Sequence, residues 1–418
     1  MRGCIMAESR RVVVTGLGLV SPVGLDEKTF WGNMLAGRHS IRRLSVLDPT
    51  QFKSPNGATV DDQIFSEALE KRSIRPFDRA LDMAMLASTC ALESGGIECA
   101  AEPPRRNMAV ITGTGGGVVG NVAESFNRFA EKGLRGVRPT TVIRIINNSI
   151  SSMISIRFRL TGPNYAVTSA CTSALNAIGI GFRMIRDGYI DCALCGGTDA
   201  MFIPAIYGAW DRIGAMSENP DPEKASRPFD RDRDGFVLGE GAGMILMETN
   251  ESAKARGARV RGEIAGYGES SDATHIAKPD KDGQIIALKA ALADAQTRPS
   301  EIGYINAHGT GTTANDESES QAIREVFGSS ADQVLVGSNK SLFGHLMGAS
   351  GAVETIATIM GLEAGRVPPN LNLDNPDPAC NLRFVSGTAT DISSPLALKN
   401  SFGFGGNNAV MVLRRYEI

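Results

Sequence analysis

The sequence predicts an α/β protein with largely parallel sheets. Short apolar runs rich in β-branched residues alternate with stretches of helical periodicity along the whole chain. Such alternation is typical of parallel sheets that are covered by helices on both faces. The length of 418 residues also exceeds a usual single core, so we expect two domains or one fold built from two halves.

Charge and composition exclude several classes of protein. The chain has 43 Lys and Arg against 46 Asp and Glu, a net charge of −3, which excludes a wholly basic nucleic-acid binder. No stretch approaches the roughly 18 to 20 apolar residues of a membrane span, and the start of the chain has a charged rather than apolar centre. The seven cysteines form no regular framework, which favours free thiols in a reducing compartment. We therefore expect a soluble, cytoplasmic protein with no nucleic-acid or membrane partner.

The first part of the chain reads as strands separated by helices. A buried strand is predicted in VVVTGLGLVSPVG, followed by helices in DEKTFWGNMLAG and FDRALDMAMLASTCALES. Further strands are predicted in RNMAVITGT, YAVTSA, DCALCGG and AGMILMET. The strand DCALCGG contains Cys192 and Cys195, whose side chains would point to opposite faces. We interpret them as structural thiols rather than as a disulfide or a metal site.

The second part of the chain repeats a pattern of the first. Strands are predicted in EIGYINAHG, QVLVGSN and NNAVMVLRR, and a charged stretch near residues 250–262 marks the join. Residues 165–185 and 333–360 each read as a buried strand, a polar turn, one reactive side chain and a helix of small residues. We therefore predict two similar halves, 1–260 and 261–418, whose strand ends meet and bring Cys171 and His345 together.

Cys171 is the candidate nucleophile. It follows the strand YAVTSA and opens a helix of small residues, so its sulfur would lie beside backbone N–H groups that lower the pKa of a thiol. A sharp turn from strand to helix also exposes a nucleophile. A buried core thiol is the alternative interpretation.

Two histidines extend this hypothesis. His308 and His345 follow apolar strands and lie among Gly, Ser and Thr, which leaves room for a substrate beside each ring. A Cys with two remote His suits thioester chemistry, in which neutral imidazoles donate hydrogen bonds to a developing oxyanion. Further ligands at close spacing are missing, so no metal is predicted. Lys340, Asp316 and Glu319 lie near the histidines in sequence and are expected to set their tautomers.

Two glycine-rich segments remain. GTGGGVVG contains a G-x-G-x-x-G, but no strand with an acidic end follows about 20 residues later, so we reject dinucleotide binding. NSFGFGGNN places Phe402 and Phe404 just before the last strand, and the glycines around Phe404 would let it swing as a gate. Core packing is the alternative for both rings.

Together these motifs resemble the β-ketoacyl-acyl carrier protein synthases, and among them the type II synthase. The resemblance runs from about residue 11 to 415 and rests on VTSACTSA, NAHGTGT, NKSLFGHLMGASGAVE, NSFGFGGNN and SRPFDRDRDGFVLGEGAGMILME. It implies a thiolase fold, with two βαβαβαββ halves in a five-layered α/β/α/β/α body. It also implies a homodimer, with a heterodimer as the alternative, and no free cofactor, because phosphopantetheine arrives on the acyl carrier protein.

The resemblance further implies a decarboxylative Claisen condensation with malonyl-acyl carrier protein in fatty-acid elongation. The catalytic residues it implies are Cys171, which takes the acyl chain, His308 and His345, which bind the malonyl thioester carbonyl, and Lys340, which orders the histidines. The other implied roles are an oxyanion hole of the Cys171 and Phe404 amides, with Phe404 as gate; substrate contacts by Thr310, Thr312, Gly116 and Phe402; support by Asn306, Asp316, Glu319 and Glu354; and a basic landing surface for the carrier protein at Arg72, Arg75, Arg135, Arg138 and Arg212.

Departures from the family pattern keep alternatives open. Gly116 stands where a bulky aliphatic residue commonly closes the acyl tunnel, which predicts a longer or wider pocket. Ala277 replaces a Thr, which removes one expected pantetheine hydrogen bond, and GGNN replaces GGTN. The leading alternative is a specialised polyketide or polyene ketosynthase. The others are a thiolase-like acyltransferase or Cys hydrolase, and a non-elongating heterodimer partner, a class that typically lacks the Cys.

Overall fold

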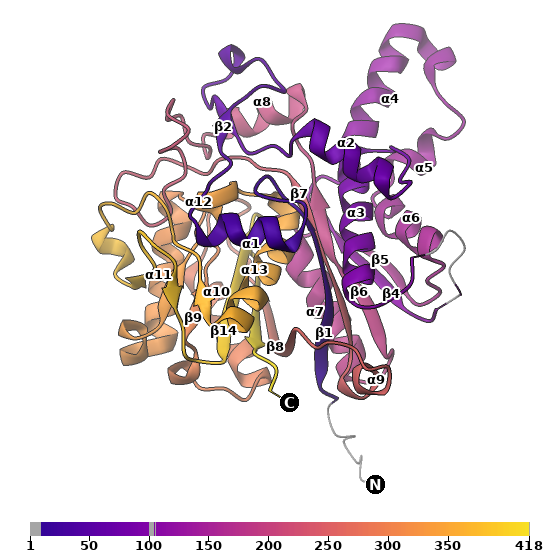
Figure 1. The fold of residues 1–418 in the computed structure, drawn as a ribbon. Helices are drawn as coiled ribbons and strands as arrows, with labels where there is room; N and C mark the ends of the chain where they lie inside the picture. The colour runs from indigo at the N-terminus through magenta and orange to yellow at the C-terminus, as the bar shows by residue number, and fades with distance from the viewer. Residues whose placement is uncertain (1–9, 100–103, 105, 418) are drawn as a thin grey trace.

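The computed structural model describes residues 10–99, 104 and 106–417, in an α/β arrangement around one large sheet (Figure 1). The strands of that sheet are β1 Val12–Val20, β4 Ala109–Gly113, β5 Asn164–Val167, β6 Cys192–Asp199, β7 Gly241–Thr249, β8 Gly262–Ser271, β9 Tyr304–Asn306, β10 Leu335–Gly337, β12 Arg383–Phe384, β14 Leu396–Gly403 and β15 Asn407–Arg414. Two small ribbons pair β2 Arg42–Arg43 with β3 Asn56–Gly57 and β11 Arg366–Val367 with β13 Thr390–Asp391.

Helices connect and cover these strands. They are α1 Glu27–Leu35, α2 Asp62–Lys71, α3 Arg79–Ser94, α4 Val119–Lys132, α5 Thr141–Ile145, α6 Ser149–Phe158, α7 Ser173–Arg186, α8 Pro204–Ile213, α9 Asn250–Ala255, α10 Lys281–Asp294, α11 Thr313–Phe327, α12 Lys340–Phe343 and α13 Ser350–Ala364. Of the short 3₁₀ turns, η2 Gly133–Gly136, η3 Ala170–Thr172 and η6 Met347–Ala349 are used below. Among the described residues, no helix combines the length and apolar character that crossing a bilayer requires.

The strand order repeats within the sheet. It runs β5-β4-β6-β7-β1 for the first half of the chain and β10-β9-β14-β15-β8 for the second, with β12 added beside β10. The strands β1 and β8 join the two sets through antiparallel pairing of residues 12–14 with residues 262–264. The prediction of largely parallel sheets is wrong in one respect, because β7 and β15 each run antiparallel to both neighbours.

Five layers result from this order (Figure 1). The helices α7 and α13 lie between the two strand sets and contact each other, while α3 packs outside β1 and β7 and α10 packs outside β8 and β15. The largest apolar cluster fills the central layer and includes Ile178, Phe182 and Ile356. The helices α7 and α13 lie side by side in the central layer, and each begins after the end of a strand. The residues just before the two helices therefore face each other.

Besides the two-residue strands β11, β12 and β13, two long strands of the second half, β8 and β14, escaped prediction. In β8, glycines at 266 and 268 hide the strand pattern. A side chain there would collide with the backbone of α10, since a Cβ would lie 2.7 and 2.3 Å from the carbonyl oxygens of Ala291 and Ala287. In β14, three consecutive polar residues, Lys399, Asn400 and Ser401, are all buried. A periodicity of apolar residues does not reveal strands whose interior is glycine or charge.

The paired cysteines of β6 behave as predicted. Cys195 is buried in the central cluster, whereas Cys192 packs against a second cluster on the other face of the strand. Both are free thiols. The strand alternation that separates them explains why they form no disulfide.

Candidate active site

A tight turn presents Cys171 at the end of β5. Ala170 has a φ of 54°, a left-handed conformation that is uncommon for a residue with a side chain, and the chain then enters η3. Cys171 therefore lies in this 3₁₀ turn, two residues before the first residue of α7, rather than in the helix itself. The strained turn confirms the sharp exit from the strand that the sequence predicted.

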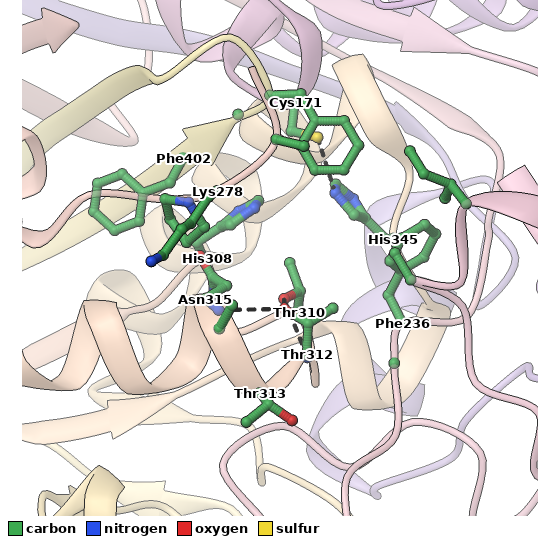
Figure 2. Close-up of a pocket in the computed structure, with 18 of the residues that line it drawn as sticks. Cys171, Phe236, Lys278, His308, Thr310, Thr312, Thr313, Asn315, His345 and Phe402 are labelled. Atoms are coloured by element: carbon green, nitrogen blue, oxygen red, sulfur yellow. Dashed lines mark hydrogen bonds between the residues drawn. The ribbon is translucent and has the colours of Figure 1, made fainter. Parts of the chain in front are cut away.

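The sulfur of Cys171 meets two imidazole rings (Figure 2). Its Sγ lies 3.2 Å from Nε2 of His345, and one ring nitrogen of His308 completes a group whose atoms all lie within 4.8 Å of one another. The two rings are 5.3 Å apart and nearly perpendicular. The predicted meeting of Cys171 and His345 across the two halves is confirmed.

Burial dominates the ionisation of this group. It raises the pKa of the Cys171 thiol to about 12, against the opposing effects of Lys340 and of the backbone amides of Phe404 and Cys171. The expectation that the helix terminus would lower this pKa is therefore wrong, because desolvation outweighs the nearby amides. Burial, reinforced by the charges of Lys340 and Lys399, holds the pKa of both His308 and His345 well below its ordinary value. Both imidazoles are neutral at pH 7.

The surroundings of His345 fix its tautomer. The backbone N–H of Met347 donates to Nδ1 at 3.2 Å, and the Ser350 hydroxyl lies 2.9 Å from the same nitrogen. A nitrogen that accepts a hydrogen bond carries no proton, so the ring hydrogen sits on Nε2, which faces the sulfur of Cys171. His345 is thus a hydrogen-bond donor toward the reacting atoms.

His308 is held by its backbone rather than by its ring. The N–H groups of His308 and Gly309 each donate to one oxygen of Glu319 at 2.8 Å, and the His308 carbonyl accepts from Lys340 Nζ at 2.6 Å. None of the described residues provides a partner for Nδ1 of this ring, which lines the cavity. Asp316 instead accepts from the amides of Gly311 and Phe229. Neither carboxylate touches an imidazole, so the expectation that they set the tautomers is corrected: they shape the loop.

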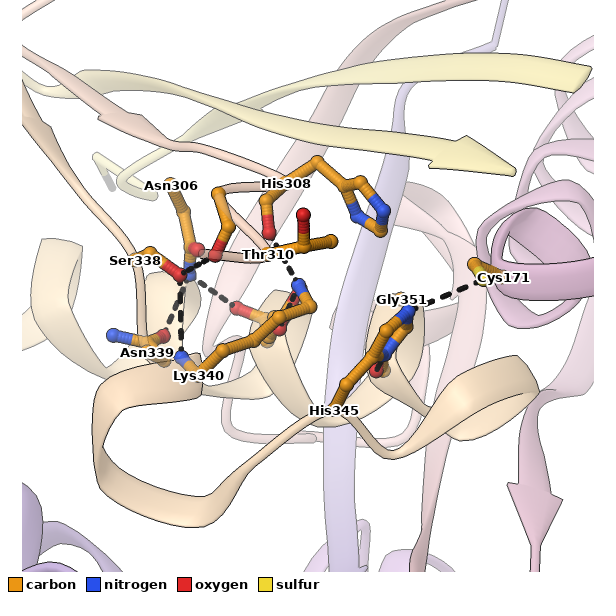
Figure 3. Close-up of polar contacts among 12 residues, drawn as sticks. Cys171, Asn306, His308, Thr310, Ser338, Asn339, Lys340, His345 and Gly351 are labelled. Carbon is orange, nitrogen blue, oxygen red and sulfur yellow. Dashed lines mark hydrogen bonds and ion pairs between the residues drawn. The ribbon is translucent and has the colours of Figure 1, made fainter. Parts of the chain in front are cut away.

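A buried network stands behind the histidines (Figure 3). Lys340 Nζ lies 2.7 Å from Glu354, and Asn306 donates to Asn339 and Thr358 at 2.8 and 2.9 Å. The family motifs predicted the roles of Lys340, Glu354 and Asn306 but not those of Asn339 and Thr358. It missed Lys399, whose ammonium lies 2.7 Å from the other oxygen of Glu354.

A cavity of about 400 Å³ leads to the sulfur. Thr310 and Thr312, whose hydroxyls lie 2.9 Å apart, line it together with Phe402 and Phe404. The Phe404 ring stacks on Trp210 with the ring centroids 5.8 Å apart, a contact that was not predicted from the sequence. Other lining residues that sequence reasoning missed are Phe236, Lys278, Asn315 and Met347. Phe236 and Met347 lie within the family motifs but had no predicted role, whereas Lys278 and Asn315 reach the cavity only through the folding of their loop and helix start.

Gly116 lies away from this cavity. Its N–H donates to Asp199 at 2.9 Å, and a Cβ added at this position would lie 2.8 Å from Cε of Met201. Met201 is buried in the same cluster as Cys171. The Met201 side chain fills the space beside Gly116, and the longer or wider pocket expected there stays a prediction.

The five arginines of the expected landing surface belong to the first half. Arg72 pairs with Glu93 at 3.2 Å and Arg138 pairs with Glu124 at 2.6 Å. Arg75, Arg135 and Arg212 are exposed and have no ion pair with any described residue. These residues lie at the end of α2, between α4 and α5, and on α8, elements that Figure 1 shows along the upper edge of the molecule.

Comparison with known proteins identifies relatives of the whole chain. Residues 9–253 match the family model "Beta-ketoacyl synthase, N-terminal domain" and residues 261–374 match its C-terminal counterpart. The chain is 38% identical to 3-oxoacyl-[acyl-carrier-protein] synthase 2 of Synechocystis, over 98% of this chain and 99% of the relative. It is 40% identical to the protein of the same name from Vibrio cholerae, over 97% and 99% of the two chains.

Solved structures agree with these relatives. The ishigamide ketosynthase/chain length factor superposes with a TM-score of 0.89 at 35% identity, over 98% of this chain and all of that chain. A type II polyketide ketosynthase in complex with its acyl-carrier protein and bound to the hexaketide also gives 0.89, at 29% identity and the same coverage. The layered structure is the thiolase fold that the motifs implied. The chain belongs to the β-ketoacyl synthase family.

Proposed function

We propose that the protein condenses an acyl chain held on Cys171 with malonyl-acyl carrier protein and releases CO2 and β-ketoacyl-acyl carrier protein. The observation that carries this proposal is the convergence of the Cys171 sulfur and two neutral imidazoles at the end of one cavity. The relatives are named 3-oxoacyl-[acyl-carrier-protein] synthase 2, which is the name of an enzyme that makes this product. No free cofactor or metal is part of the proposal, and its location in the cytoplasm stays the prediction made from the cysteines.

In the first half-reaction, the sulfur of Cys171 attacks the carbonyl carbon of an acyl thioester. The bond from that carbon to the pantetheine sulfur breaks, and the thiol proton of Cys171 ends on the departing sulfur. His345 Nε2–H, 3.2 Å from Sγ, stabilises the sulfur while it carries negative charge. The amides of Cys171 and Phe404, which lie by the sulfur, form the oxyanion hole for the acyl carbonyl.

In the second half-reaction, the malonyl carboxylate leaves as CO2, and its bonding electrons pass to the thioester enolate. The imidazoles of His308 and His345 donate to the enolate oxygen, which is where negative charge develops. The enolate carbon attacks the acyl carbonyl, the bond to Cys171 breaks, and the sulfur takes one proton from water. Thr310 and Thr312 hold the pantetheine arm, and Phe402 and Phe404 border the acyl chain. Lys340 and Glu354, with Asn306, Asp316 and Glu319, keep the loops in place.

Intact-mass measurement tests this function. The protein is incubated with acyl-acyl carrier proteins of graded chain length, with Cys171→Ala as the control. We expect an acyl adduct on the unchanged protein alone, followed by CO2 release and loss of the adduct when malonyl-acyl carrier protein is added. Absence of any adduct with every donor would exclude the proposal, and turnover without CO2 release would favour a thiolase-like acyltransferase.

A specialised polyketide or polyene synthase is the second candidate. Ala277 lines the cavity without a hydroxyl, and the similar structures include a ketosynthase bound to the hexaketide. The same experiment distinguishes the candidates. Adducts that form only with unsaturated or poly-oxo chains favour the specialised enzyme, whereas adducts with saturated chains of ordinary length favour fatty-acid elongation.

The carrier protein and a second subunit are the proposed partners. The related ketosynthase is in complex with its acyl-carrier protein. In this chain, we propose that the carrier protein docks on Arg72, Arg75, Arg135, Arg138 and Arg212. Apolar side chains of the α4–α5 segment stand exposed, with Phe126 at 67% and Leu134 at 83%. We propose that a second copy of the chain covers these side chains. We also propose that each chain divides into its two halves between residues 260 and 261. Native mass spectrometry tests this: a dimer that Leu134→Glu dissociates supports it, and a monomer contradicts it and points to a missing heterodimer partner.

A further inference from the structure

A second buried lysine shares the carboxylate that holds Lys340. Lys399 lies in the middle of β14 and is fully buried, and its Nζ lies 2.7 Å from Oε2 of Glu354. Lys340 takes the opposite oxygen, Oε1, at the same distance. Lys399 and Glu354 form an ion pair, and the Lys399 ammonium also donates to the carbonyl of Asn400. One carboxylate therefore stands between two ammonium groups in the interior of the protein.

Burial of two ammonium groups beside one carboxylate has a cost in the free energy of folding. A charge that is removed from water requires a partner of opposite sign, and one carboxylate balances only one ammonium. The next carboxylate in the network is Glu319, which holds the amides of His308 and Gly309. Asn400, the neighbour of Lys399 on β14, donates to Glu319 at 3.0 Å. Successive residues of one strand thus reach both carboxylates that support the histidine loop.

We propose that Lys399 is a positioning residue for the decarboxylation step: it holds Glu354 so that Lys340 stays on the His308 carbonyl, and it adds a buried positive charge beside both imidazoles. This inference rests on the proposed function. It concerns a residue that acts through its neighbours, since Lys399 is absent from the cavity lining. Lys340, in contrast, contacts the His308 carbonyl directly at 2.6 Å.

The electrostatics of the imidazoles support this role. Lys340 and Lys399 both lower the pKa of His308 and of His345, in addition to burial. The charged and titratable groups around the two rings are Lys340 from α12, Lys399 from β14, Glu354 from α13, Glu319 and Asp316 from α11, Cys171 from η3 and Asp199 from β6. Loss of Lys399 leaves Lys340 as the one lysine of this set against several carboxylates. The imidazoles would then gain protons at a higher pH and lose their capacity to act as neutral donors.

The experiment compares Lys399→Met and Lys399→Arg with the unchanged chain. Acylation of Cys171 is measured by intact mass. CO2 release from malonyl-acyl carrier protein is measured between pH 5 and 9. For Lys399→Met we expect CO2 release to fall about 10-fold at neutral pH and its acidic limb to move to higher pH, while the acylation rate changes less. Lys399→Arg keeps the charge, so its CO2 release should have the same pH profile as that of the unchanged chain. Lys281→Met, which removes an exposed lysine paired with Glu325, is the matched control.

The outcomes separate this inference from the proposed function. If the unchanged protein forms no adduct and releases no CO2, the proposed function fails. If the unchanged protein is active and Lys399→Met has the same rates and pH profile, the role of Lys399 is excluded. Equal losses in both half-reactions, with an unmoved acidic limb, also exclude it and leave a structural residue. Should Lys399→Met unfold at assay temperature, Lys399→Gln, which keeps a donor for the Asn400 carbonyl without the charge, gives the same test.

Discussion

The two halves of the molecule share a strand order but bury different chemistry at the strand ends that meet. In the first half, the loop after β4 binds the buried Asp199 through backbone amides and one hydroxyl at 2.8 to 2.9 Å, and β5 leads to the uncharged thiol of Cys171. In the second half, the equivalent strands β9, β10 and β14 lead to or carry His308, Lys340 and Lys399. One backbone plan therefore presents a nucleophile in apolar, amide-lined surroundings and, opposite it, imidazoles on a charged network.

This division matches the two half-reactions. Acyl transfer needs a sulfur and amide donors, whereas decarboxylation needs donors for a developing enolate, in a field that keeps the imidazoles neutral. Because the fold is repeated, the loops of each half can differ in their residues, while the central helices α7 and α13 hold the two sets of strands together. His345 is the residue that serves both, because its Nε2 faces Cys171 while its backbone belongs to the second half.

Substitutions in the first half and in the second half of the chain should affect different half-reactions, and this is the largest effect we expect. Cys171→Ala should abolish the acyl adduct and lower condensation at least about 10³-fold, while leaving measurable CO2 release because both imidazoles remain. His308→Ala should lower CO2 release about 10²- to 10³-fold through loss of one enolate donor and leave acylation within about 10-fold. Intact mass and CO2 measurements on both variants check this. Equal loss of both half-reactions in both variants would contradict the division.

The pH dependence of Cys171 should distinguish the buried thiol from a helix-activated one. Because burial raises the pKa to about 12, the thiolate fraction at pH 7 is small and grows with pH. The rate of alkylation by iodoacetamide should therefore rise about 10-fold per pH unit from pH 7 to 10 without a plateau. A thiol with a lowered pKa would instead plateau below about pH 8. The chemical step with substrate should depend less on pH, since the neutral imidazoles keep their protonation state throughout this range.

The sequence allowed the reactive residues to be predicted better than their surroundings. The strand-turn-helix pattern around Cys171 and His345 consists of residues that are neighbours in the sequence, so it can be recognised from the sequence alone. The family motifs added His308 and Lys340. Asp199 and Met201 were missed because their roles come from contacts with a loop more than 80 positions earlier in the chain. Lys399 was missed because a lysine in an unrecognised strand reads as surface. The direction of the Cys171 pKa failed for the same reason: burial is a property of the packed molecule.

Packing near Gly116 tests how the first half limits the acyl chain. The φ of Gly116 lies outside the left-handed region, so a side chain is opposed by Met201 rather than by the backbone. Gly116→Ile should lower the free energy of unfolding by about 1 to 3 kcal/mol through overpacking, and the added Met201→Ala should restore most of it. Urea unfolding of both single variants and the double variant measures the coupling. The double variant should also move the preferred donor length in the intact-mass assay, and additive single effects would exclude the contact.

The smallest expected effect concerns the surface of the first half. Arg212 is exposed on α8, between Trp210 and Ile213, which line the cavity. Arg212→Glu should raise the KM for acyl-acyl carrier protein about 3- to 10-fold at low salt, and the difference should shrink at high salt because exposed charges are screened. The matched control is Arg298→Glu in the second half, where Arg298 is an exposed arginine paired with Glu301. If the carrier protein docks on the first half alone, the control keeps the unchanged KM. An equal rise in both variants would show that net charge, and not a docking surface, governs the encounter.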